Sequence, residues 1–146
     1  MSYPYEEAYI STVFEYKDFP KDWPKDFAIL TAYATTGETW TDAQNKEADQ
    51  KLEDELRKAG YRLHRISGYS KELDTHEEGW AVAMPLQVAW ELAIKYKQVA
   101  LFYYRNDELL LVYALNFSKY DEAIVKVPRP LDVKSTPYLK RVVFNK

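Results

Sequence analysis

The side chains best suited to binding a small polar molecule are hydroxyl, amide and carboxyl groups that fall beside the ends of predicted strands and helices. They are Thr31, Tyr33, Asn45, Glu77 and Gln98. Thr31 and Tyr33 share one face of an apolar strand predicted over residues 27–33, while Asn45 lies on the core-facing side of a helix start. A buried amide without a hydrogen-bond partner costs about 1–3 kcal/mol, so such groups need partners. We therefore predict a small polar pocket beside the end of this strand.

A structural role is the alternative for the two amides in this set. Most buried polar side chains bond to backbone, so Asn45 and Gln98 could tie loop main chain together without any ligand. Glu77 and Glu78 beside His76 could supply acid–base groups or ligands for a hard metal, although the same residues also suit a solvated loop. No nucleophile paired with a base is visible in the sequence, so we assign no catalytic residue, no metal site and no cofactor.

A second candidate site is the densest basic stretch of the chain, which could receive a phosphate or an acidic partner. Its residues are Arg57, Arg62, His64 and Arg65. Such a site requires Arg62 and His64 to share a strand face with Arg57 nearby. The alternative is that these cations stabilise a helix C-terminus and occupy an exposed strand face. His64 has no second His or Cys at metal-ligand spacing, so we predict an imidazole that binds no metal.

Length, charge and composition argue against several classes of protein. The 146 residues correspond to about one domain, and the formal net charge of −3 argues against general nucleic-acid binding. The absence of Cys excludes disulfides, thiolate nucleophiles and Cys-based metal sites, and a content of only 4 Gly argues against a dinucleotide-binding or phosphate-binding loop. The sequence shows no signal-peptide pattern and no long apolar run, so we expect a cytoplasmic protein without membrane contact.

Apolar periodicity and turn residues predict an α+β fold. Residues 5–10 suit one or two helical turns, and residues 11–16 alternate like an edge strand. The main elements follow as strand 27–33, helix 41–58, strand 61–67, strand 77–84, a helix starting at Pro85, and hairpin strands 99–104 and 109–115. This order, β-α-β-β-α-β-β, predicts a single mixed sheet of about five strands with both helices packed on one face, like a split βαβ sandwich with an added hairpin strand.

Local signals mark both ends of the first long helix. The segment Thr41-Asp42-Ala43-Gln44 has the form of a capping box, and Gly60 supplies a left-handed cap after the basic residues Arg57 and Lys58. The helix therefore runs from about residue 41 to about residue 58, which places Asn45 in its first turns.

The C-terminal part of the chain has weaker patterning. Prolines separate two strand-like segments, residues 123–127 and 139–144. We predict a single domain, 1–146, with a core over about residues 8–115. The irregular extension, residues 116–146, is expected to wrap over the edge or the open face of the sheet.

Four segments share short motifs with one family. They are Phe27–Tyr33, Gln44-Asn45, Glu77–Val82 and Tyr96–Ala100, which resemble a Thr-Ala-Trp-Asn-Pro strand, an early-helix Asn, a Glu-Pro-Ser-Phe stretch and a Phe-x-Gln-x-Ala motif. Ala34-Thr35 replaces the Asn-Pro of the first motif, and Glu77 and the aromatic Trp80 retain the third in part. Over about residues 8–115 the chain thus resembles a family of small bacterial proteins catalogued only as a domain of unknown function. The resemblance implies a shared fold and no known activity.

Three classes of function remain, and we predict the first. It is a non-enzymatic binding module that holds an unidentified small polar ligand in a pocket near the end of the central strand. The alternative is a protein-interaction domain, an inhibitor or adaptor, because 13 Tyr, 4 Trp and 6 Phe make the chain rich in residues that anchor interfaces. The third is an enzyme acting on a small polar or phosphorylated substrate.

Overall fold

The computed structural model describes residues 4–34, 38–70, 74–115 and 117–128. These residues form α1 (Glu6–Ile10), β1 (Val13–Glu15), β2 (Phe27–Leu30), α2 (Asp42–Lys58), β3 (Leu63–Ser70), β4 (Thr75–Val82), α3 (Leu86–Lys95), β5 (Ala100–Arg105), β6 (Glu108–Tyr113), the short 3₁₀ turn η1 (Tyr120–Glu122) and β7 (Ile124–Lys126). The fold is therefore α+β, as the sequence predicts.

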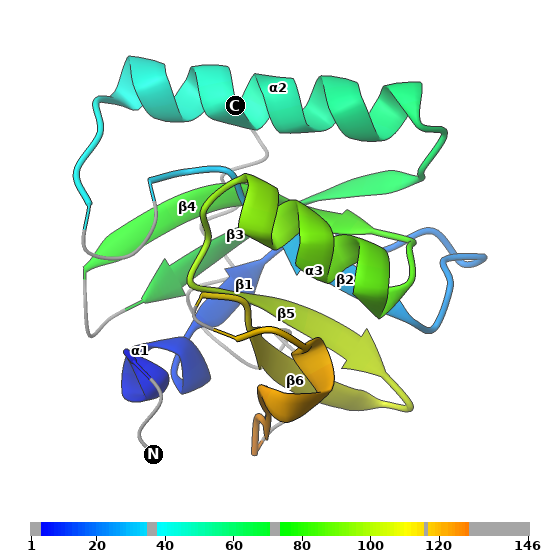
Figure 1. Cartoon of the computed structure of the whole chain (residues 1–146). Helices are drawn as coiled ribbons and strands as arrows, with labels where there is room; N and C mark the ends of the chain where they lie inside the picture. The colour runs from blue at the N-terminus through cyan, green and yellow to red at the C-terminus, as the bar shows by residue number, and fades with distance from the viewer. Residues whose placement is uncertain (1–3, 35–37, 71–73, 116, 129–146) are drawn as a thin grey trace.

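The described strands form one sheet in the order β1-β3-β4-β2-β5-β6-β7, and every neighbouring pair is antiparallel. The prediction of a mixed sheet is therefore wrong. α2 joins β2 to β3 across the intervening β4, and α3 joins β4 to β5 across the intervening β2. In each case the intervening strand is antiparallel to both of the strands that the helix joins. The two joined strands therefore run parallel to each other without being neighbours (Figure 1).

The described residues contain two strands and one helix more than the predicted five strands and two helices. β1 and β7 are three-residue strands at the two edges of the sheet, and α1 has five residues. Such short elements show strand-like or helix-like patterns in sequence without showing whether they join the main sheet. β7 belongs to the predicted extension 116–146, so part of that extension completes the sheet. The other strand-like segment, 139–144, lies outside the described residues.

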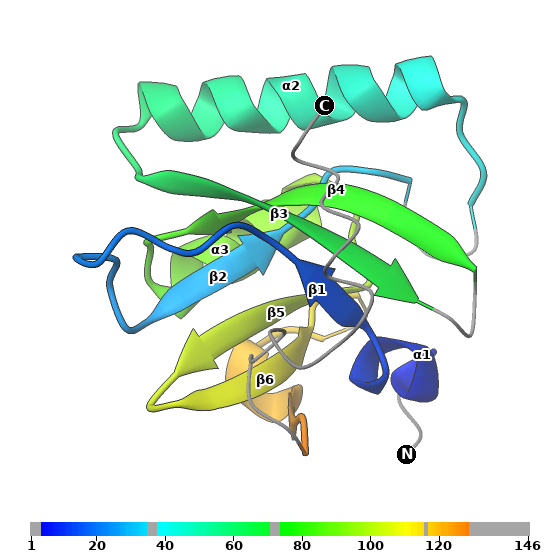
Figure 2. The ribbon, with the colours of Figure 1, turned by 180° about the vertical axis from the view of Figure 1, so that it is seen from behind.

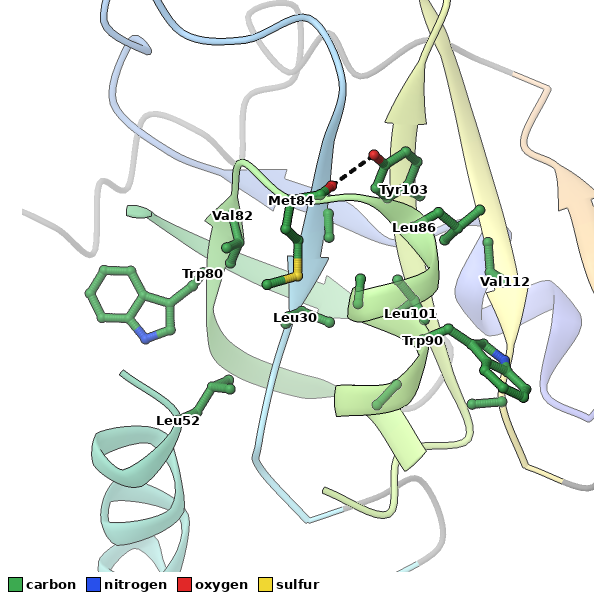
Figure 3. Packing of buried hydrophobic residues seen from close by; sticks show 14 of the residues in the cluster. Leu30, Leu52, Trp80, Val82, Met84, Leu86, Trp90, Leu101, Tyr103 and Val112 are labelled. Carbon is green, nitrogen blue, oxygen red and sulfur yellow. Dashed lines mark hydrogen bonds between the residues drawn. The ribbon is translucent and has the colours of Figure 1, made fainter. Parts of the chain in front are cut away.

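α2 and α3 cover the same face of the sheet, as the sequence predicts (Figure 1). Figure 3 shows the core beneath them, where strand residues meet apolar side chains of both helices. The labelled members are Leu30, Leu52, Trp80, Val82, Met84, Leu86, Trp90, Leu101, Tyr103 and Val112. The hydroxyl group of Tyr103 donates a hydrogen bond to the carbonyl oxygen of Met84 at 2.8 Å, so this polar group is satisfied inside the core. This packing holds the ends of β2 and β4 in place.

α2 begins and ends where its sequence signals predict. The Thr41 side chain accepts a hydrogen bond from the Gln44 backbone, and the Gln44 side chain accepts one from the Thr41 backbone, which completes the capping box. At the other end Gly60 adopts φ of 89°, and the backbone of Tyr61 donates to the carbonyl oxygen of Leu56. These caps fix which side of α2 faces the sheet.

Aromatic side chains occupy much of the opposite face of the sheet. Phe14, Phe27 and Tyr113 belong to this second buried cluster, against which Tyr9 and Phe102 pack. Figure 2 shows α1 and β1 on this side, away from the two long helices. The two faces of the sheet are therefore covered differently, by α2 and α3 on one side and by α1 and the segment that carries Phe19 and Trp23 on the other.

Candidate functional site

A cavity of about 90 Å³ opens on the sheet face away from α2 and α3, beside the end of β2. Its lining comes from α1, β1, β2, β3, β4 and β5 and from the residues just outside them. The lining residues are Tyr9, Thr12, Phe14, Ile29, Leu30, Thr31, Ile66, Gly68, Ser70, Thr75, Glu77, Gly79, Gln98, Ala100, Leu101 and Phe102. A cavity of this size holds a small molecule or several waters.

Two glycines leave the floor of the cavity open. Gly68 of β3 pairs with Glu77 of β4, and Gly79 of β4 pairs with Ile66 of β3, so neither Gly places a side chain in the space above the sheet. A Cβ atom at Gly68 would lie 3.5 Å from the Thr12 side chain, which is an ordinary contact. A Cβ atom at Gly79 would lie 2.5 Å from the carbonyl oxygen of Leu30, so that position admits no side chain without a backbone shift.

Aromatic rings form an apolar wall of the cavity. The rings of Phe14 and Phe102 meet edge to face, with 5.0 Å between their centroids, and Tyr9 meets Phe102 edge to face at 6.5 Å. α1 and β1 thus contribute to the cavity through packing rather than through charge.

Glu77 is the only acidic side chain among the described residues of the lining, and it is partly buried. Burial raises the pKa of its carboxyl group from the ordinary 4.5 to about 7, although a hydrogen bond with the Thr31 side chain acts in the opposite direction. No Lys, Arg or His of the described residues forms an ion pair with it. The site therefore contains a carboxyl group that lacks a counter-ion from the described part of the chain.

Thr31 and Gln98, the other predicted site residues in the lining, also hold main chain in place. The Thr31 hydroxyl donates to the carbonyl oxygen of Glu78 at 3.0 Å and accepts from the backbone of Tyr33 at 3.2 Å. Gln98 donates to the carbonyl oxygens of Tyr33 at 2.8 Å and Tyr96 at 3.2 Å. Both side chains therefore fix the chain that leaves β2 and the chain that enters β5.

Asn45 and Tyr33, by contrast, do not line the cavity. The Asn45 side-chain oxygen accepts a hydrogen bond from the backbone of Ala34 at 2.8 Å, which is the structural role considered as the alternative. The pKa of Tyr33 is raised by burial and by the nearby negative charges of Glu78 and Asp49. The structure thus brings Thr31, Glu77 and Gln98 of the predicted set to one cavity and separates the other two from it.

A polar network lies on the opposite face of β3 and β4, under α2. Arg65 donates two hydrogen bonds to the carboxylate of Asp49, at 3.0 and 2.7 Å, and one to the carbonyl oxygen of Gly79. Its guanidinium lies 4.1 Å from the centre of the Trp80 ring, and its Nε lies 3.6 Å from Glu78. Arg65 therefore connects α2 to the sheet through charge and ring stacking together.

His76, Glu77 and Glu78 fall on alternate faces of β4 and do not form one acid–base group. Glu77 points to the cavity side. Glu78 accepts a hydrogen bond from Ser67 on the other side, where His76 lies 3.4 Å from the Glu15 carboxylate and 4.0 Å from that of Glu78. Alternation along the strand thus isolates Glu77 from its two neighbours in sequence.

The four residues of the basic stretch are likewise divided by the sheet. Arg62 pairs with Asp22 at 3.1 Å, and His64 lies 2.8 Å from the carbonyl oxygen of Lys17. Arg57 pairs with Glu53 at 2.8 Å and, like Arg65, approaches the Trp80 ring from the helix side. Each Arg already has an acidic partner, so the structure does not assemble these residues around one anion.

Sequence reasoning missed the residues that create the cavity, above all Gly68 and Gly79. The sequence contains a signal for them, because Gly68 and Gly79 fall at the end of one predicted strand and inside another, where a Gly leaves a position without a side chain. Using that signal requires knowing that β3 and β4 are neighbours and how their residues pair.

Two features are absent from the described ranges, a cluster of metal ligands and a membrane-spanning helix. No group of three or more His, Asp or Glu side chains is arranged to hold a metal ion there. In the same part of the chain, no helix has both the length and the apolar character needed to cross a bilayer.

Comparison with known proteins places the chain beside one family. Neither the curated proteins nor the solved structures gave a significant match. Residues 30–101 match the family model described as Protein of unknown function (DUF3293), which confirms the resemblance to a family of unknown function that the motifs indicate.

Proposed function

We propose that this protein is a binding module for a small ligand, with its site in the cavity beside the end of β2. The observation that carries the proposal is a partly buried Glu77 carboxyl group that lines a hollow without a counter-ion from the described residues. A charged or polar group in an apolar surrounding is costly unless it is satisfied, so a ligand that bonds to Glu77 gains from the interaction.

Catalysis is the second candidate, because a carboxyl group with a pKa of about 7 suits a general acid or base. The lining supplies hydroxyl groups from Thr12, Thr31, Ser70 and Thr75, but its described part supplies no Lys, Arg or His that could activate one. Binding therefore accounts for the lining residues with fewer assumptions than catalysis does.

A protein-interaction role has less support, because the described residues show few exposed aromatic or apolar side chains gathered in one place. The rings that such a surface would expose are Trp23, Trp40 and Trp80; Trp80 is 7% exposed and lies beneath Arg65, and Trp23 and Trp40 are half-buried. The large apolar residues that are exposed within the described segments, Tyr5, Ile94 and Leu115, come from separate parts of the chain.

The test is a thermal-shift screen of the protein against a library of small metabolites. A ligand that binds only the folded state at a hundred times its dissociation constant stabilises it by about 2.7 kcal/mol. The variant Gly68→Val places a branched side chain in the cavity, so it should reduce the shift produced by any true ligand. Circular dichroism of this variant checks that the fold persists.

Asn45→Ala is the matched control, because Asn45 holds the Ala34 backbone and lies outside the cavity lining. This variant should have a lower melting temperature and an unchanged ligand-induced shift measured from its own baseline. A ligand whose shift survives Gly68→Val and disappears in Asn45→Ala would contradict the proposed position of the site.

A further inference from the structure

We infer that the ligand of this cavity is a small organic cation, an amine with an apolar body, whose ammonium group pairs with the Glu77 carboxylate. This inference rests on the proposed function and names the chemical class of the ligand. It follows from the carboxyl group of Glu77 in the cavity, from the position of the Arg65 and His76 cations on the opposite face of the sheet, and from the aromatic rings of the cavity wall.

The charges that the described residues bring to the cavity favour a cation. Among these residues, Glu77 supplies the only carboxyl group of the lining, and none of the described lining residues is Lys, Arg or His. On the two floor strands, Arg65 of β3 and His76 of β4 lie with Asp49, Glu78 and Glu15 on the opposite face of the sheet. His64 of β3 shares the face of Ile66 and Gly68, but it is not a lining residue, and its ring lies 2.8 Å from the carbonyl oxygen of Lys17. A phosphate or carboxylate ligand would therefore meet one negative group and no positive one, whereas an ammonium group would meet its counter-ion.

The rest of the lining favours an apolar body on that cation. Phe14, Phe102 and Tyr9 bring three rings to one side, and Ile29 and Ile66 add aliphatic surface. Aromatic rings attract a cation as well as an apolar group, so a ring wall beside a carboxylate suits an alkyl or aryl amine better than an inorganic ion. Ser70 and Thr75 add hydroxyl groups to the same lining.

Glu77 also makes such binding depend on pH. The free protein holds Glu77 partly protonated near neutral pH, while a simple alkylamine stays protonated until well above pH 8. The described groups that share the cavity with Glu77 are hydroxyl groups, the Gln98 amide, apolar side chains and aromatic rings, with no second carboxyl group and no Lys, Arg or His among them. The affinity for an amine should therefore rise between about pH 5 and pH 8 and then level off.

Backbone NMR provides a position-specific test, because glycine amide signals form a small and separate group in a chain with 4 Gly. The probes are butylamine and benzylamine, each compared with the neutral alcohol of the same skeleton, 1-butanol and benzyl alcohol. Gly68 and Gly79 report on the cavity floor, and Gly60, at the end of α2, serves as an internal control. We expect the amines to shift the Gly68 and Gly79 signals at pH 8 without moving Gly60, and to bind about tenfold more tightly than the alcohols.

Two variants separate the role of Glu77 from a general effect of charge. Glu77→Gln keeps the size of the side chain and should remove both the preference for amines and its dependence on pH. Glu78→Gln changes the neighbouring carboxyl group, which lies on the other face of the sheet, and should leave both unchanged.

The outcomes of this test are distinguishable from those for the proposed function. Equal or tighter binding of the alcohols at Gly68 and Gly79 would overturn the assignment of an amine while supporting a ligand site in the cavity. No response of Gly68 and Gly79 to either amine would also overturn the assignment. The proposed function itself falls only if no library ligand produces a thermal shift that Gly68→Val reduces.

Discussion

Glu77 of β4 lies directly across from Gly68 of β3, so the carboxyl group faces a position that carries no side chain. This pairing leaves the carboxyl group beside a hollow at the position of Gly68, while burial by the surrounding residues raises the pKa of Glu77. The consequences extend to stability as well as to binding.

The two floor glycines should respond differently to the same substitution. Gly68→Ala should be neutral or stabilising by up to about 1 kcal/mol, because the new methyl group makes ordinary contacts and the unfolded chain loses freedom. Gly79→Ala should destabilise by about 1–3 kcal/mol, because its Cβ would lie 2.5 Å from the Leu30 carbonyl oxygen and force β2 and β4 apart. Urea denaturation of both variants measures these changes. Equal effects at the two positions would contradict the described strand contact.

The raised pKa of Glu77 predicts a pH-dependent cost to stability. Its folded-state value of about 7 lies above the ordinary 4.5, so the folded protein holds a proton that the unfolded chain releases. This cost is absent below about pH 4.5, grows as the pH rises to 7, and reaches at most about 3 kcal/mol above that. Glu77→Gln should therefore be more stable than the parent at pH 8 and nearly equal to it at pH 4.5. Denaturation curves across this range would refute the prediction if the difference between the two proteins stayed constant.

Asn45 should contribute to stability through one acceptor oxygen. Asn45→Ala leaves the backbone of Ala34 without the acceptor that now lies 2.8 Å away, which should cost about 1–2 kcal/mol. Asn45→Asp keeps an acceptor oxygen in the first turns of α2, where negative charge is favourable, so it should lose less stability. Chemical denaturation of the pair checks the ranking, and a larger loss in Asn45→Asp would argue against this role.

The ion pair that connects α2 to the sheet should matter more than an ion pair on the surface of α2. Asp49→Ala should destabilise by about 1–3 kcal/mol, since Arg65 then keeps a partly buried charge without its bidentate partner. Glu53→Ala removes the partner of Arg57, which is 57% exposed, and should cost less than about 0.5 kcal/mol. Thermal unfolding of the two variants provides the comparison, and similar losses would show that Arg65 gains little from Asp49.

The sequence predicts an element well when residues close to its ends determine where it begins and ends. α2 is bounded by the capping box of Thr41 and Gln44 and by the left-handed Gly60, all of which act within a few residues of the helix ends. The order of the strands could not be obtained in the same way. Whether β4 inserts between β2 and β3 depends on contacts between residues far apart in sequence, and only those contacts show that the sheet is antiparallel.

The sequence indicates several polar residues of the candidate site, but it does not indicate the cavity that they line. Thr31, Glu77 and Gln98 were identified as polar groups near strand and helix ends, and they line one cavity. Asn45 belongs to the same sequence pattern, but its side-chain oxygen accepts a hydrogen bond from the backbone of Ala34. Residue types and spacing do not distinguish a side chain that lines a cavity from one that binds backbone. The hollow itself depends on Gly68 pairing with Glu77 and Gly79 pairing with Ile66 across neighbouring strands, which is information that only the pairing register contains.

The most direct measurement of the central claim is the titration of the Glu77 carboxyl group by carbon-13 NMR, assigned by the loss of its signal in Glu77→Gln. We predict that this carboxyl group titrates near pH 7 in the free protein and at a lower pH when butylamine is present. A carboxyl group that titrates near the ordinary 4.5 and does not respond to butylamine would contradict the account.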